Sequence, residues 1–87
     1  MSYQVCLRSS AQKDLDAVIG REYAAIARAI SALEKNPRPL KVKKLAESGL
    51  WRVRVKQYRI IFAIDDKAMQ VIIVRVARRS EDTYKGL

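Results

Sequence analysis

The sequence predicts an α+β domain in which a two-helix hairpin covers one face of a small antiparallel sheet, in the order β-α-α-β-β-β. Between residues 9 and 34, apolar side chains recur at spacings of three and four, which is the periodicity of helices. Residues 50–64 and 69–76 alternate apolar and polar side chains or are apolar in a short run, as strands are. The 87 residues are enough for one domain, so we expect a single domain over residues 1–87.

The N-terminal part is expected to form one strand and both helices. Residues 2–8 alternate apolar and polar side chains and predict the first strand. The two serines that follow are candidate N-caps of a helix that ends at Gly20. A second helix begins at Arg21 and stops before Pro37, because the residue before a proline avoids helical dihedral angles. Its apolar stripe, expected in the core, consists of Tyr23, Ile26, Ala27, Ile30 and Leu33.

Residues 50–64 predict a β-hairpin with one apolar and one cationic face, because side chains alternate across a strand. The apolar face consists of Trp51, Val53, Val55, Tyr58, Ile60, Phe62 and Ile64. The other face carries Arg52, Arg54, Lys56 and Arg59. Like charges on one sheet face repel, so we expect nearby acids or an anionic partner to compensate them.

Residues 69–76 predict the last strand. This run is apolar on both faces, which is typical of a central strand. Strict alternation places Ile72, Val74 and Val76 on one face of this strand. The same alternation places Val71, Ile73, Arg75, Ala77 and Arg79 on the other face.

The charge balance points to a polyanionic partner. The chain has 18 basic and 9 acidic residues, a net charge of +9. Its cations concentrate in the hairpin and in the connector before it, residues 36–49, which contains Lys41, Lys43 and Lys44. Such an excess favours RNA, DNA, an acidic protein or anionic lipid as a partner, and solubility alone is the alternative explanation.

The composition also excludes several kinds of chemistry. With the single cysteine Cys6, the chain has no internal disulfide, and with no histidine it has neither a histidine-based acid–base pair nor an ordinary zinc site. We therefore expect no metal and no cofactor, and any catalysis must use Arg, Lys, Tyr, Glu or Asp. The sequence has no long apolar run and no signal-like N-terminus, which predicts a cytoplasmic protein with no membrane partner.

The hairpin reads LWRVRVKQYRIIFAIDD over residues 50–66, and the last strand ends in VARR with a tyrosine a few residues later. Together with the Asn-Pro stop at 36–37 and the Lys-Leu pair at 44–45, these motifs resemble the RelE/ParE family of toxins. The likeness covers nearly the whole chain. It implies a RelE-like fold and the toxin role in a toxin–antitoxin system, restrained by a cognate antitoxin. In the RelE-like branch it implies a metal-independent endoribonuclease that cuts mRNA in the ribosomal A site and inhibits translation.

The resemblance also indicates which residues form the site. By position, the catalytic residues are Arg52, Arg54, Arg59, Arg79 and Tyr84. Further contacts to RNA phosphates are expected from Lys43, Lys44, Lys56, Arg78 and Lys85. Arg78 is the alternative to Arg79 in the catalytic set, and Tyr84 is expected either to stack on a base or to act as general base. The family pattern has lysines where this chain has Arg52 and Arg54, and arginine does not lose its proton in proteins, so these two are expected to clamp phosphate.

Other interpretations of the same residues remain open. The ParE-like branch keeps the fold but poisons DNA gyrase by binding it, and a third alternative is an inactive homologue that only binds its antitoxin. Arg52 and Arg54 would then be strand charges that prevent aggregation. Arg59 would pair with Asp65 or Glu47, and Tyr84 would only pack the C-terminal segment. Two departures from the family pattern are the turn Lys56–Gln57 in place of a glycine and Ala46 in place of a basic residue.

Overall fold

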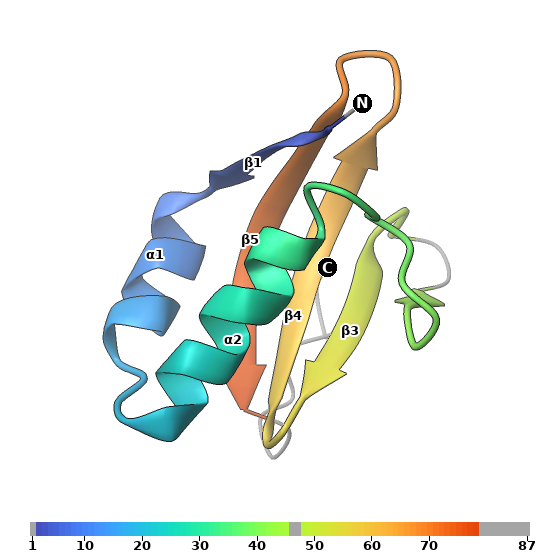
Figure 1. Cartoon of the computed structure of the whole chain (residues 1–87). Coiled ribbons are helices and arrows are strands. Elements are labelled where there is room, and N and C mark those ends of the chain that lie inside the picture. Colours follow the sequence, from blue (N-terminus) through green and yellow to red (C-terminus); the bar gives the residue numbers. More distant parts are fainter. Residues whose placement is uncertain (1, 46–47, 79–87) are drawn as a thin grey trace.

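The structure, a computed structural model, describes residues 2–45 and 48–78. Within these ranges the elements are β1 (Gln4–Leu7), α1 (Ser9–Asp16), α2 (Arg21–Ala32), β2 (Lys43–Lys44), β3 (Trp51–Val55), β4 (Tyr58–Asp65) and β5 (Gln70–Arg78). Both helices lie on one side of the sheet, with α2 in front of the central strands and α1 beside the outer strands (Figure 1). The predicted α+β class is confirmed.

No described helix is long and apolar enough to span a bilayer.

The sheet has the strand order β1-β5-β4-β3-β2 and is mixed, whereas an antiparallel sheet was predicted. The strands β3, β4 and β5 pair antiparallel as expected, but β1 runs parallel to β5. Alternation within a strand does not show the direction of pairing, and β1 and β5 are the first and last strands of the chain rather than the two arms of a hairpin. The two-residue strand β2, which pairs with the outer edge of β3, was not predicted.

The core lies between the helices and the apolar face of the hairpin. Phe62 and Ile60 of β4 are fully buried there, and so is Ile26 of α2. The other core residues are Ala11, Leu15, Val18, Ile30, Leu33, Val53, Tyr58, Val71, Ile73 and Val76. The predicted apolar face of the hairpin is thus the face that the helices cover.

Helix α1 protects the edge of β5 that β1 leaves uncovered. The pairing of β1 with β5 ends at Ile73. Beyond it, the Ser10 hydroxyl donates to the carbonyl of Val74 at 2.8 Å, and the backbone N–H of Val76 donates to the Asp14 carboxylate at 2.9 Å. Side chains of α1 therefore satisfy backbone groups that an exposed edge strand would offer to other chains.

A β-bulge in β5 overturns the predicted alternation of its side chains. Phe62 pairs with Ile73, whereas its neighbour Ile61 pairs with Arg75, so Val74 is an extra residue in the ladder. The insertion shifts the phase by one residue, because a bulge places two residues opposite one. As a result Val71, Ile73 and Val76 share the core, although Val76 was expected on the opposite face from the other two.

Tyr23 was expected in the core but is 45% exposed. It lies in the first turn of α2, and the buried residues of this helix are Ile26 and Ile30, with Leu33 directly after its end. A stripe with helical periodicity shows which residues share a face, but not how far along the helix the sheet extends.

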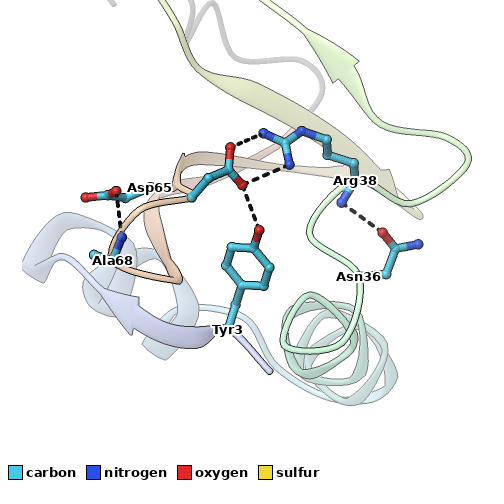
Figure 2. A network of polar contacts seen from close by, with 6 residues as sticks. Tyr3, Asn36, Arg38, Asp65 and Ala68 are labelled. Atoms are coloured by element: carbon cyan, nitrogen blue, oxygen red, sulfur yellow. Dashed lines mark hydrogen bonds and ion pairs between the residues drawn. The ribbon is translucent and has the colours of Figure 1, made fainter. Parts of the chain in front are cut away.

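A polar network joins the N-terminal segment, the connector and the turn between β4 and β5 (Figure 2). The Tyr3 hydroxyl donates to the Asp66 carboxylate at 2.7 Å, and the Arg38 guanidinium donates two hydrogen bonds to it, at 2.8 and 3.2 Å. The hydrogen bonds from Arg38 and Tyr3 lower the pKa of Asp66 from 3.8 to about 2. The same bond to Asp66 raises the pKa of Tyr3.

Candidate nucleic-acid interface

The face of the sheet turned away from the helices carries Arg52, Arg54 and Arg59, and we call it the arginine face. The neighbours of these residues along the strands, such as Val53 and Ile60, point into the core, so the arginines point the other way. Arg54 lies directly opposite Arg59, and Arg52 lies opposite Ile61. Arg52 and Arg54 are two residues apart on β3, a distance of about 7 Å along the strand. The three arginines therefore occupy adjoining positions.

The surroundings of these arginines favour an anion. Arg54 and Arg59 are a directly opposed pair of like charges, an arrangement that destabilises a sheet. Arg52 is only 8% exposed, and among residues 2–45 and 48–78 no carboxylate forms an ion pair with it. A buried charge without a counter-charge is costly, and a bound phosphate would supply that charge.

The alternative ion pair between Arg59 and Asp65 is not formed. These residues lie six positions apart on the same strand, about 20 Å at the rise of a β-strand. Asp65 instead accepts a hydrogen bond from the backbone N–H of Ala68 at 3.1 Å, within the turn that follows β4. The other candidate partner, Glu47, lies outside the described residues.

Two lysines of the connector, Lys43 and Lys44, were predicted to bind phosphate, and they lie on opposite faces of the sheet. Lys43 pairs with Arg52 and therefore shares the arginine face. Lys44 pairs with Trp51, and its ammonium lies 5.5 Å from the centroid of the Trp51 ring. The Arg38 guanidinium lies 5.1 Å from the same centroid, so Trp51 contacts two cations on the helix side. Of the two lysines, the structure brings only Lys43 to the arginines.

Lys56 occupies the turn between β3 and β4 with φ 54°, in the left-handed region that favours glycine. It is exposed, and it follows Arg54 by two residues. The chain thus uses a lysine where the family pattern has a glycine, at a conformational cost of about 1 kcal/mol. This places an additional cation at the end of the arginine face.

Arg78 lies on the face opposite to the three arginines. It pairs with Tyr58, whose side chain is in the core, and it lines an open cavity of about 220 Å³ under α1. The other residues around this cavity are Asp14, Ala17, Val18, Tyr58 and Val76. The remaining predicted residues, Arg79, Tyr84 and Lys85, lie outside the described residues.

The sequence did not single out Arg75 for the site. In the structure it lies opposite Ile61 of the neighbouring strand, so its Cβ shares the arginine face, while its guanidinium turns to Asp14 of α1 at the edge of the sheet. Its Nε donates to Asp14 of α1 at 2.6 Å, and a terminal nitrogen donates to the second carboxylate oxygen at 3.2 Å. Only the bulge places Arg75 opposite Ile61, and a bulge leaves no local signal that a single sequence reveals.

This arrangement can bind and polarise phosphate. Guanidinium groups donate paired hydrogen bonds to phosphate oxygens and stabilise negative charge that develops there. In the described part of the chain, no group of three or more Cys, Asp or Glu side chains lies close enough together to hold a metal ion.

Comparison with protein families identifies one family for this chain. The sequence model of the ParE toxin of the type II toxin–antitoxin system parDE matches residues 5–83. Among curated protein sequences, none matches the chain.

Solved structures of RelE toxins have the same fold. The toxin–antitoxin complex RelBE2 from Mycobacterium tuberculosis aligns with a TM-score of 0.80 and 29% identity, over 91% of this chain and 100% of the other. The RelE–RelB complex from Pyrococcus horikoshii aligns with a TM-score of 0.81 and 26% identity, over 93% and 99% of the two chains. The isolated RelE toxin of E. coli, at 14% identity, shares the fold with a TM-score of 0.78, over 94% and 90% of the two chains.

Proposed function

Because the chain belongs to the ParE toxin family of type II toxin–antitoxin systems, we propose that it is a ribosome-dependent endoribonuclease of the RelE-like kind, which cleaves mRNA and inhibits translation. The observation that carries this proposal is the arginine face, where Arg52, Arg54 and Arg59 occupy adjoining positions without a metal-binding cluster among the described residues. The likeness to RelE toxins above 25% identity supports the choice of branch.

The reaction uses a nucleophile that RNA carries itself. The 2′-hydroxyl oxygen attacks the adjacent phosphorus, the bond from phosphorus to the 5′-oxygen breaks, and a cyclic phosphate and a 5′-hydroxyl result. The 2′-hydroxyl loses one proton and the leaving 5′-oxygen gains one, so the step needs no external reactant. Arginines contribute by stabilising the negative charge on the phosphate oxygens as the transition state forms.

The roles of individual residues follow from their chemistry. Arg52, Arg54 and Arg59 clamp the scissile phosphate, because guanidinium groups stay protonated and cannot serve as a base. Arg79 joins them and Tyr84 stacks on a base or takes the proton, as the family motif implies. If Tyr84 acts as the base, positive charge near its phenol would favour the ionised form. The ribosome supplies the alignment of the mRNA.

The partners follow from the same proposal. A chain with a net charge of +9 is suited to bind an acidic or amphipathic cognate antitoxin. The solved RelE chains from M. tuberculosis and P. horikoshii are in complexes with an antitoxin. The ribosome and mRNA are the targets, and the cytoplasm is where the chain meets them. Charge-driven binding of the antitoxin would weaken as salt is added.

Primer extension on a translated mRNA with purified ribosomes tests the activity. We expect cuts at A-site codons with the wild-type protein and about 10²- to 10³-fold slower cleavage with Arg59→Ala, the typical loss of one charge-stabilising donor. Arg28→Ala, which removes an exposed arginine from α2, is the matched control and should cleave like the wild type. Cleavage that persists in Arg59→Ala would move the site away from this face, and no cleavage by folded wild-type protein would refute the nuclease.

The second candidate function is the poisoning of DNA gyrase. It is favoured by one observation, that the family model matching residues 5–83 describes the ParE toxin of parDE. A supercoiling assay with purified gyrase separates the two functions, because inhibition of gyrase by a protein that leaves mRNA intact would establish the ParE-like activity. Harmless expression without any antitoxin would indicate an inactive homologue.

A further inference from the structure

Four residues form a row across the arginine face, at right angles to the strands. The register pairs Lys43 of β2 with Arg52 of β3, Arg52 with Ile61 of β4, and Ile61 with Arg75 of β5. Paired residues in neighbouring strands point to the same face. Strands are spaced about 4.8 Å apart, so the row spans about 14 Å from Lys43 to Arg75.

A second row lies next to the first, two residues further along the strands. It consists of Arg54 of β3, Arg59 of β4 and Ala77 of β5. The two rows together hold five cations, on four neighbouring strands. Along any one strand there are at most two of them, so the positive charge is extended across the strands rather than along them.

Arg75 is held at its end of the row by contacts outside the sheet. Asp14 accepts two hydrogen bonds from its guanidinium and a third from the backbone N–H of Val76. The Asp14 carboxylate therefore fixes both the side chain and the strand that carries it. A guanidinium held in this way loses little further conformational entropy when it binds an anion.

The row has the dimensions of a short stretch of nucleic-acid backbone. A stacked strand carries one negative charge per about 3.4 Å of its axis, so 14 Å corresponds to about four phosphates. A strand crossing the face along this row would meet Lys43 at one end, Arg52 and its neighbours in the middle, and Arg75 at the other end. The centre holds the three arginines to which the cleavage site is assigned.

We propose that the RNA backbone crosses the arginine face perpendicular to the β-strands, and that Lys43 and Arg75 bind the phosphates on either side of the scissile one. This inference rests on the proposed nuclease function and specifies the path of its substrate. Lys43 and Arg75 are positioning residues, which set the register of the RNA but do not act on the reacting phosphate. Asp14 contributes by orienting Arg75.

The test is the salt dependence of binding to a fluorescent single-stranded 2′-deoxy oligonucleotide, which lacks the nucleophile and cannot be cleaved. Each phosphate contact adds about 0.7 to the slope of log Kd against log salt concentration for single strands. We expect Lys43→Gln and Arg75→Gln each to reduce the slope by about 0.7 and the double variant by about 1.4. Arg75→Lys should keep the slope, since it keeps the charge, and Arg28→Gln should leave it unchanged.

Two further variants separate a defined path from attraction by total charge. Lys44→Gln and Arg78→Gln remove charges from the same strands but from the opposite face. If they reduce the slope as much as Lys43→Gln and Arg75→Gln do, binding follows net charge and the proposed path is wrong. A slope that Lys43→Gln and Arg75→Gln leave unchanged, or wild-type protein whose binding to the probe does not depend on salt, would also overturn it.

The cleavage assay and the binding assay test the nuclease function and the RNA path separately. Cleavage on ribosomes combined with unchanged slopes would refute the path and leave the nuclease intact. Reduced slopes without any cleavage would support the path and refute the nuclease. Thermal unfolding of each variant checks that Arg75→Gln still folds, and where it does not, Lys43→Gln, at an exposed position, provides the test.

Discussion

The two faces of the sheet contrast in what they contribute to the protein. On the helix side, Phe62 and Ile60 are fully buried among apolar neighbours, and this burial favours folding. On the arginine face, the like charges Arg54 and Arg59 lie directly opposite each other, and Arg52 is buried without a carboxylate partner among the described residues. One face of the sheet thus supplies the apolar core, and the other concentrates positive charge.

The largest effect on stability is expected on the helix side. Phe62→Ala removes a fully buried ring and should lower the free energy of unfolding by about 3–5 kcal/mol. Urea denaturation followed by circular dichroism measures it. Tyr23→Ala, at an aromatic residue that is 45% exposed, is the control and should change stability far less. Equal losses in the two variants would contradict the position of the core.

An intermediate effect on the free energy of unfolding is expected where Asp14 of α1 contacts β5. Asp14→Asn removes the charge that Arg75 and the Val76 N–H share, and should cost about 1–2 kcal/mol, allowing for the partial exposure of the pair. The same denaturation experiment measures it. Asp16→Asn, an exposed acid two residues along the same helix, should be close to neutral. A neutral Asp14→Asn would show that this carboxylate does not contribute to holding α1 on β5.

A mutation on the arginine face should lower cleavage and leave the free energy of unfolding nearly unchanged. Arg54→Gln changes an exposed side chain of β3, so we expect stability to stay within about 0.5 kcal/mol of the wild type, while cleavage on ribosomes falls. Parallel measurement of unfolding and of primer extension tests the pair of outcomes. A large loss of stability would mean that this arginine is structural, and the contrast between the faces would fail.

The smallest effect concerns pH and lies away from both faces. The pKa of Asp66 is lowered to about 2 from 3.8 by its hydrogen bonds, so its contribution to stability is fully present above about pH 4 and is lost as pH falls towards 2. Asp66→Asn should remove this part of the pH dependence between pH 4 and 2, seen as a smaller shift of Tm with pH. Asp65→Asn is the control in the same turn, and an equal change there would contradict the assignment.

The sequence predicts the local features of the fold well, because they depend on neighbours in the chain. The helix pair, the hairpin and the shared face of Arg52, Arg54 and Arg59 all follow from periodicity, and the structure agrees with each. The directly opposed pair Arg54 and Arg59 follows from a two-residue turn.

Features that depend on distant residues could not be predicted. The parallel direction of β1, the pairing of Lys43 with Arg52, and the bulge that turns Arg75 to the arginine face are set by contacts between segments far apart in the chain. For the same reason the sequence grouped Lys44 and Arg78 with the arginines, although the sheet places both on the other side. The parts of the site predicted at Arg79 and Tyr84 stay predictions.

The parallel pairing of β1 with β5 has a consequence for how the protein is made. Gln4 and Gln70, which start this pairing, are 66 positions apart, so the sheet cannot close while the chain is short. Such long-range pairing forms late, because the helices and strands that lie between β1 and β5 in the chain must be ordered first. During synthesis, β1 can therefore pair with β5 only after β5 has left the ribosome, and Arg75 takes its place in the sheet only then. A nascent chain without β5 lacks part of the arginine face. This face is therefore complete only after most of the polypeptide has left the ribosome, which is the proposed target.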